Sequence, residues 1–336
     1  MVRHVTLHLG GALLALALLC AIPAISGRWL GAHASFTLVL MVGAAVVFLV
    51  GFIWKIARWM GAPIPFRIAL TTGQHRSLPS LAYDPSRSPY TAWQVALRVL
   101  FDVALFRPLL RATPSASLHS TRLSGYAGRL LWLFAVAFHV SLVIVVLRHL
   151  RLFLTPVPHF VSWLQDADSL SELFVPKLHV TSILLLLALG LLIGRRLVLA
   201  RLRYISLAAD YFPLLLLTGI ATTGVLMRHV TRTDITAVKA MMTSLASFSF
   251  ASPQPVDSML LVHLFLVCAL LVYFPLSKLM HMPGALMSPT LTLADNSRAV
   301  RHINVCNPEV QFLHYSDYEA TFRDRMIEAG LPVEEP

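Results

Sequence analysis

Six long and almost uncharged apolar segments dominate this sequence, and each is long enough, or nearly so, to cross a bilayer as a helix. Only 13% of the 336 residues are charged, whereas a soluble domain averages about 25%. These features exclude a disordered chain, a disulfide scaffold and an ordinary soluble enzyme, and they predict an all-α membrane protein. We place the six helices at about Leu9–Ile25, Phe36–Trp54, Leu130–Leu147, Phe174–Ile193, Tyr211–Met227 and Ser258–Leu279.

Lysine and arginine residues are unevenly divided between the two sides that these helices define. Twenty lie on one side, ten of them between Lys55 and Arg129, and seven lie on the other. Because positively charged loops stay in the cytoplasm, we expect both termini inside, with His149–Pro176 and His229–Asp257 outside. The same rule explains the formal net charge of +11 without a nucleic-acid partner. We expect a multi-pass protein in contact with the lipid of a bacterial or archaeal cytoplasmic membrane.

The spans and the polar segments divide the chain into four parts. Residues 1–58 hold two helices, the first of which also resembles a secretory signal, although its length favours a retained helix. Residues 59–129 form a basic insertion, 130–289 a four-helix domain, and 290–336 a polar tail expected to dock on a cytoplasmic partner. Inside the insertion, Tyr90–Arg111 predicts a basic amphipathic helix that lies on the inner surface, docks a partner, or packs as a loop helix.

Four of the fourteen histidines form a pattern on the third and sixth predicted helices. His139 and His149 are ten residues apart, about 15 Å along a helix axis. His263 and His281 are eighteen residues apart, which is five turns and about 27 Å, so a continuous helix presents both on one face. Antiparallel packing of the two helices pairs His149 with His263 near the outer face and His139 with His281 near the inner face. Because the two histidines are about 15 Å apart on one helix and about 27 Å apart on the other, the helices, or the groups bound between the pairs, must be tilted.

Two facing histidine pairs at two depths are what two bis-histidine b-type haems need, because each neutral imidazole gives one nitrogen to iron. The residues alone leave core histidines, a proton relay or another metal site open. A zinc site gathers its ligands around one point, unlike pairs spread across a membrane. We therefore expect two haem b groups, with the irons held by His139, His149, His263 and His281.

The segments around these histidines resemble the gamma subunit of respiratory nitrate reductase over about residues 130–289. Phe138-His139 through Arg148-His149 is similar to its second helix. The last helix of that family resembles Val262-His263 through Phe274-Pro275-Leu276-Ser277-Lys278-Leu279-Met280-His281, and similar pairs occur at Ala209-Asp210 and Pro176-Lys177. The tail, with Tyr318-Glu319-Ala320-Thr321-Phe322-Arg323, looks like the M subunits (DsrM) of the Dsr sulfite-reduction-associated membrane complex.

This resemblance implies a dihaem cytochrome b of dissimilatory sulfur metabolism, an electron-transfer subunit rather than an enzyme alone. It implies electron exchange with menaquinone or ubiquinone near the outer haem, and with a cytoplasmic heterodisulfide-reductase-like iron–sulfur subunit through the inner haem. Further implied partners are a periplasmic multihaem cytochrome c, a periplasmic iron–sulfur protein and a second membrane quinone-interacting subunit. The direction of electron flow stays open.

Three alternatives to this interpretation are kept, and one of them is a purely structural membrane anchor whose histidines are unused. A gamma-type cytochrome b subunit of a nitrate or heterodisulfide reductase predicts the same haems with a different cytoplasmic partner. A transporter with a histidine and lysine proton pathway predicts a colourless protein, but the chain has no obvious inverted repeat.

Charged residues near the predicted outer haem are further candidates. Lys177 matches the lysine at the quinol site of the nitrate reductase family, and its ammonium group could hydrogen-bond a quinone oxygen. The alternative is a lysine that reaches the outer interface. Arg148 could pair with a haem propionate, in competition with Arg151, or contact lipid headgroups. His179 is either a proton acceptor or, as we favour, a core histidine.

Overall fold

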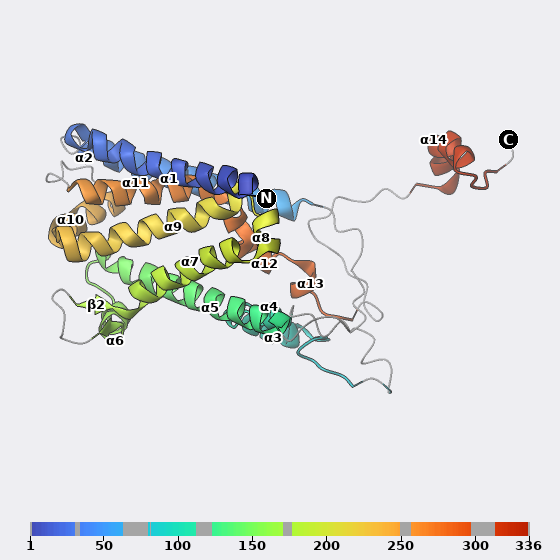
Figure 1. Cartoon of the computed structure of the whole chain (residues 1–336). Coiled ribbons are helices and arrows are strands. Elements are labelled where there is room, and N and C mark those ends of the chain that lie inside the picture. Colours follow the sequence, from blue (N-terminus) through green and yellow to red (C-terminus); the bar gives the residue numbers. More distant parts are fainter. Residues whose placement is uncertain are drawn as a thin grey trace.

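The computed structural model describes residues 2–30, 34–62, 80, 82–111, 123–170, 177–248, 257–296 and 313–334. Helices dominate these residues, and six helices are long and apolar enough to cross a membrane (Figure 1). The expected all-α membrane architecture is therefore confirmed. The six are α1 (Val2–Leu30), α2 (Ala34–Met60), α5 (Leu123–His149), α7 (Val180–Val198), α9 (Ala208–Leu226) and α11 (Ser258–Tyr273).

Short elements join these spans. In chain order the helices are α3 (Ala92–Ala104), α4 (Arg107–Arg111), α6 (His159–Ala167), α8 (Ala200–Ile205), α10 (Ile235–Ala246), α12 (His281–Leu286), α13 (Pro289–Thr292) and α14 (Tyr315–Glu328). A 3-10 turn, η2 (Leu150–Leu152), extends α5, and a π-helical turn, η3 (Met227–Thr231), extends α9. The strands β1 (Ser169–Leu170) and β2 (Leu178–His179) pair antiparallel, with Ser169 opposite His179.

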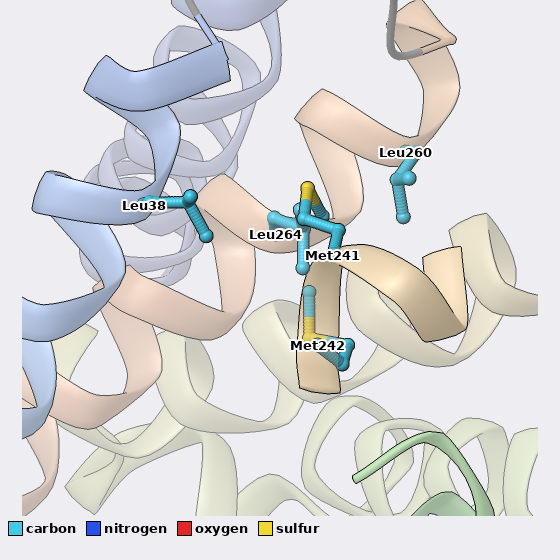
Figure 2. Packing of buried hydrophobic residues seen from close by; sticks show 5 residues of the cluster. All are labelled: Leu38, Met241, Met242, Leu260 and Leu264. Atoms are coloured by element: carbon cyan, nitrogen blue, oxygen red, sulfur yellow. The ribbon is translucent and has the colours of Figure 1, made fainter. Parts of the chain in front are cut away.

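The spans pack in a bundle in which α7 lies between α5 and α9, and α11 contacts α1, α2 and α9 (Figure 1). The first helix belongs to this core, since Ala12 packs with Tyr211 and Leu215 of α9. At the end of the bundle where α10 lies, a second cluster joins Leu38, Met241, Met242, Leu260 and Leu264 (Figure 2). Large apolar side chains such as Val46, Val143 and Leu187 remain exposed, as expected for helices that face lipid.

In the described residues, α5 and α11, which carry three of the four candidate histidines, do not pack directly against each other. α5 packs on α7, whereas α11 packs on α1, α2 and α9. The expected direct antiparallel packing of the third and sixth helices is corrected accordingly. α5 instead approaches the start of α12 through the imidazoles of His139 and His281, and His149 of α5 interacts electrostatically with His263 of α11.

The sixth span is shorter than predicted. α11 ends at Tyr273 and is followed by two 3-10 turns, η4 (Phe274–Leu276) and η5 (Lys278–Met280), with an extended residue, Ser277, between them. Pro275 lacks an N–H group and its ring crowds the preceding turn, which favours an end of the α-helix here, although α1 and α9 continue through Pro23 and Pro213. His281 begins α12, so His263 and His281 do not share one face of a continuous helix, and the separation of about 27 Å does not apply.

Other boundaries differ by a few residues. The fourth span begins at Val180, whereas the predicted start at Phe174 lies outside the described residues, as does Pro176. The predicted amphipathic segment forms α3 and α4. α3 packs against α13, because the buried Arg98 donates to the carbonyls of Leu291 and Leu293 at 2.6 and 2.9 Å.

Candidate cofactor site: two histidine pairs

One pair joins α5 to the start of α12. The ring centres of His139 and His281 are 6.1 Å apart, and the ring planes cross at 84°. His139 Nδ1 lies 2.7 Å from the carbonyl oxygen of Ala135, and His281 Nδ1 lies 2.9 Å from that of Lys278. A carbonyl only accepts, so each Nδ1 carries the proton and donates it. The lone pair of each Nε2 is therefore available to a metal.

The other pair joins α5 to α11. His149 and His263 are near enough to interact electrostatically. His149 Nδ1 lies 2.6 Å from the carbonyl oxygen of Val145, which again assigns the proton to Nδ1. His263 Nδ1 lies 2.9 Å from Oγ1 of Thr223 on α9.

The hydroxyl of Thr223 fixes the tautomer of His263 by a short chain of hydrogen bonds. Its Oγ1 lies 2.8 and 3.0 Å from the carbonyl oxygens of Gly219 and Ile220, to which it donates its one proton. The hydroxyl can then only accept from the imidazole, so Nδ1 of His263 is protonated. All four histidines thus keep Nε2 as the free nitrogen.

This donor set fits a bis-histidine haem iron. Metal–imidazole bonds of about 2 Å place two rings on one metal with their centres about 6 Å apart, and the His139–His281 rings lie at 6.1 Å. Among the described residues, no three histidine, cysteine or carboxylate side chains converge as a metal site does. Each pair offers two Nε2 atoms, the number of protein ligands that an iron needs when its other ligands come from a porphyrin.

The turn before His281 explains the motif residues around it. Ser277 Oγ accepts from the backbone N–H of Leu279 at 3.2 Å and caps η5. Lys278 Nζ lies 2.7 Å from Asp210 Oδ1, whose other oxygen accepts from the N–H of Leu207 at the start of α9. Because the carbonyl of Lys278 also accepts from His281, the Lys278–Asp210 ion pair connects this histidine to α9.

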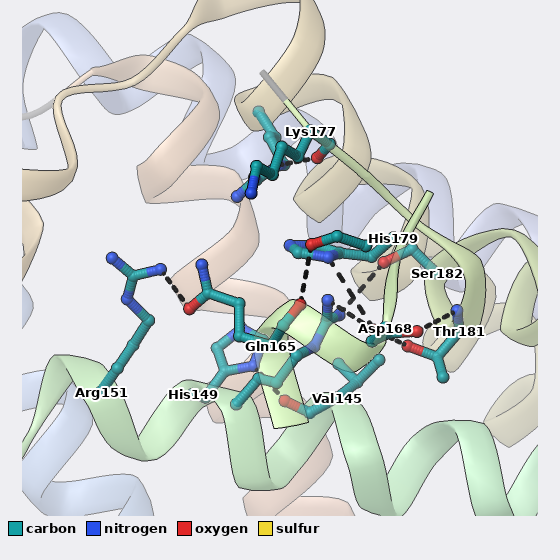
Figure 3. Close-up of polar contacts among 12 residues, drawn as sticks. Val145, His149, Arg151, Gln165, Asp168, Lys177, His179, Thr181 and Ser182 are labelled. Carbon is teal, nitrogen blue, oxygen red and sulfur yellow. Dashed lines mark hydrogen bonds and ion pairs between the residues drawn. The ribbon is translucent and has the colours of Figure 1, made fainter. Parts of the chain in front are cut away.

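Arg148, near the C-terminal end of α5, forms a buried ion pair that was not predicted. Its Nη1 lies 2.7 Å from Oδ2 of Asp168, and its Nη2 donates to Oγ of Ser182 at 3.3 Å (Figure 3). Asp168 also accepts from the N–H and the hydroxyl of Thr181, at 2.8 and 2.6 Å. The carboxylate therefore fastens the end of α5 to the start of α7, beside His149. Arg148 Nε has no hydrogen-bond partner among the described residues, and its role with a propionate stays a prediction.

The remaining candidates lie around this ion pair. The side chain of Lys177 is exposed, and its backbone carbonyl accepts from Nε of Arg228 at 3.0 Å (Figure 3). His179 is buried, with Nδ1 3.9 Å from Asp168 Oδ2, too far for a hydrogen bond. Burial, and then the nearby Arg148 and Arg228, lower the pKa of His179 to about 4, so its ring is neutral near pH 7. Arg151 donates to Gln165 of α6 at 2.6 Å.

Sequence reasoning missed Thr223 and Asp168, which contact the predicted site residues. Thr223 is 40 positions from His263, and Asp168 is 20 positions from Arg148. A threonine in an apolar helix and an aspartate in a loop are both common, so neither carried a signal before the helices were placed.

Comparisons with known proteins show what this chain is similar to. Residues 89–302 match the family described as nitrate reductase gamma subunit. The chain is 38% identical over 272 residues to the Hdr-like menaquinol oxidoreductase cytochrome b-like subunit of Archaeoglobus fulgidus, which covers 79% of this chain and 81% of the relative. It is 36% identical over 278 residues to the protein of the same description from Archaeoglobus profundus, which covers 80% and 82%. The family match begins at residue 89 rather than near 130, so it includes α3 and α4.

Proposed function

The chain belongs to the nitrate reductase gamma subunit family, and from this premise we propose that it is a dihaem cytochrome b that carries electrons between quinone and a cytoplasmic iron–sulfur subunit. The quinone is menaquinone in this proposal rather than ubiquinone, because both relatives are described as parts of menaquinol oxidoreductases. Both are also described as Hdr-like, which favours a heterodisulfide-reductase-like partner.

The observation that carries the proposal is the state of the four imidazoles. In each pair, both Nδ1 atoms are held by acceptors, and the inner rings stand 6.1 Å apart. Histidine ligands of metals donate their other ring nitrogen in this way, which fixes ring orientation and raises ligand basicity. An unrelated core histidine needs no such common pattern.

The residues of the chain have distinct parts in this function. His139 with His281, and His149 with His263, would each hold one haem, which when bound supplies reversible one-electron transfer. The side chains of His139 and His263 are partly buried, whereas those of His149 and His281 are exposed in the structure, so the bound porphyrin would itself cover part of each site. Near the outer pair, the ammonium group of Lys177 is available to donate to a quinone oxygen, whereas His179, whose pKa is lowered to about 4, stays neutral and has the part of a core histidine. In quinol oxidation the protons leave on the outer side.

The assembly around the chain follows from the same proposal. The basic inner surface and the tail dock the cytoplasmic iron–sulfur subunit. The outer side meets a periplasmic multihaem cytochrome c and a periplasmic iron–sulfur protein, and a second membrane subunit also interacts with quinone. The similarity of the tail to M subunits of the Dsr complex favours sulfur metabolism, and co-purification distinguishes this assembly from a nitrate reductase.

Haem quantification with redox titration tests the proposal. We expect the purified chain to hold two low-spin b-type centres, and each of the variants His139→Ala, His149→Ala, His263→Ala and His281→Ala to lose one. His159→Ala, on α6 and outside both pairs, is the matched control and should keep both centres. A colourless protein, or unchanged haem content in any of the four variants, would contradict the assignment.

The quinone assignment has its own test. Lys177→Ala should raise KM for a menaquinol analogue about tenfold, the loss expected when one charge-assisted hydrogen bond of about 1.5 kcal/mol disappears. Lys239→Ala, on α10, is the control. Equal KM values for the two variants would argue that Lys177 lies at the outer membrane–water interface and does not contact the quinone.

A further inference from the structure

The basic insertion contributes a side chain to the inner histidine pair. Its two helices, α3 and α4, meet at an elbow formed by Leu105 and Phe106. The ring centre of Phe106 lies 4.7 Å from that of His139, with 37° between the ring planes. An aromatic ring from outside the four-helix domain thus packs against a histidine expected to bind haem iron.

Interactions on both sides hold the elbow in place. Nε1 of Trp132, on α5, donates to the carbonyl of Leu105 at 2.7 Å. Nε of Arg107 lies 2.8 Å from Oδ1 of the buried Asp102, and its guanidinium group stands 5.4 Å over the ring of Phe101. The elbow is therefore fastened to α5 and cross-linked between α3 and α4.

The backbone of Phe106 is in a conformation that aromatic residues rarely adopt. Its φ is +51°, in the left-handed region. Non-glycine residues stay in that region only where the surrounding structure holds them, and such residues cluster at functional sites. Here the left-handed turn is what directs the chain from α3 into α4 at the level of His139.

In our interpretation the elbow lies at membrane depth, because it packs on the apolar span of α5. The apolar span of α5 begins at Gly128, and His139 lies eleven residues further along, about 16 Å along the axis. Irregular backbone at such depth needs its polar groups satisfied within the protein. Leu105 meets this need, since its N–H donates to the carbonyl of Phe101 at 3.0 Å and its carbonyl accepts from Trp132.

We propose that Phe106 is a positioning residue for the inner haem site: its ring holds the plane of the His139 imidazole and keeps water from that side of the ligand. This proposal rests on the proposed function, because it requires a haem at the His139–His281 pair. The hydrophobic shell around a haem ligand sets its solvent access, and solvent access sets the reduction potential. Water beside His139 would stabilise the oxidised haem iron, which carries the higher charge. Loss of the Phe106 ring should therefore lower the reduction potential of the inner haem.

Two substitutions and one control test this role in the purified full-length protein. Phe106→Gly removes the ring while the positive φ stays accessible, so the elbow keeps its path. Phe106→Leu keeps an apolar side chain without a flat face. Phe101→Leu, the control, changes a phenylalanine of α3 near the elbow, whose ring contacts Arg107.

We expect two haems in every variant. In Phe106→Gly one midpoint potential should fall and the g values of that centre should shift in electron paramagnetic resonance, while the other centre is unchanged. Phe106→Leu should change the g values with a smaller fall in potential, and Phe101→Leu should match the unchanged protein. Loss of the inner haem alone in Phe106→Gly also supports the role.

The outcomes separate the two proposals. Two haems with unshifted potentials and g values in Phe106→Gly would overturn the role of Phe106 and leave the proposed function intact. Equal shifts in Phe101→Leu would overturn it as well, because they would show a general effect of the elbow. An unchanged protein without haem would overturn both proposals.

Discussion

At the residue scale, the ring nitrogens that face away from the expected irons are the most informative atoms in the molecule. Three of the four Nδ1 atoms bond to backbone carbonyls three or four positions earlier in the chain, and the fourth bonds to Thr223. A backbone carbonyl is present whatever the side chain, so only the fourth contact depends on a residue that mutation can remove.

Thr223→Val should weaken the outer histidine pair. Valine matches the shape of threonine but cannot accept from His263, so the imidazole loses its orientation. Loss of such an outer partner costs about 10–100-fold in metal affinity. We expect partial loss of one haem and a broadened signal from that centre.

Thr218→Val is the matched control, because Thr218 lies on the same helix and donates only to the carbonyl of Leu214. Haem titration of both variants measures the difference. Full haem content in Thr223→Val would show that the hydroxyl does not orient His263.

Asp168→Asn should destabilise the folded protein. Arg148 would keep its charge in a buried site without the carboxylate that now lies 2.7 Å away. Breaking a buried ion pair by removing one partner costs about 3–5 kcal/mol. Thermal unfolding in detergent checks this against Asp166→Asn, an exposed neighbour on α6. Equal unfolding temperatures for the two variants would contradict a structural role for the pair.

At the element scale, the decisive feature is where the sixth span stops. Composition alone predicts one apolar helix to Leu279, but α11 ends at Tyr273 and the chain turns through η4 and η5. This break places His281 opposite His139. It also needs room, which Gly51 of α2 provides.

Gly51→Ala should disturb this break. A Cβ atom at Gly51 would lie 2.8 and 2.9 Å from Cγ and Cβ of Pro275, and a proline ring cannot rotate aside. Overpacking of this kind costs about 1–3 kcal/mol. We expect a lower unfolding temperature together with reduced occupancy of the inner haem.

Gly43→Ala, on the same helix, is the control, since a Cβ atom there meets nothing within 4 Å. It should be neutral or slightly stabilising, because alanine favours the helix. If Gly51→Ala unfolds at the same temperature as Gly43→Ala, the close approach of α2 and η4 is not a constraint on the fold.

At the scale of the whole molecule, charge distribution orients the bundle. The twenty lysine and arginine residues of one side face the cytoplasm in our interpretation, and the seven of the other side face outward. With this orientation, the His139–His281 pair would lie near the proposed cytoplasmic partner and the His149–His263 pair near the proposed quinone site.

Cysteine labelling measures this orientation. In a background without Cys20, Cys268 and Cys306, an impermeant maleimide should label Thr236→Cys in intact cells and Arg87→Cys only after permeabilisation. Both positions are exposed, so access depends on the side of the membrane. The reverse pattern would invert the assignment of the two haem sites.

The sequence by itself determined the membrane class, the number of spans, the family and the four candidate ligands. These follow from local properties, namely the length of uncharged runs, the positions of basic residues and the chemistry of imidazole. It could not determine that the imidazoles of His139 and His281 lie 6.1 Å apart, that Thr223 contacts His263, or that Phe106 packs on His139. Each of these contacts joins residues at least 33 positions apart in the sequence. Which of these residues meet depends on where the helices end and turn.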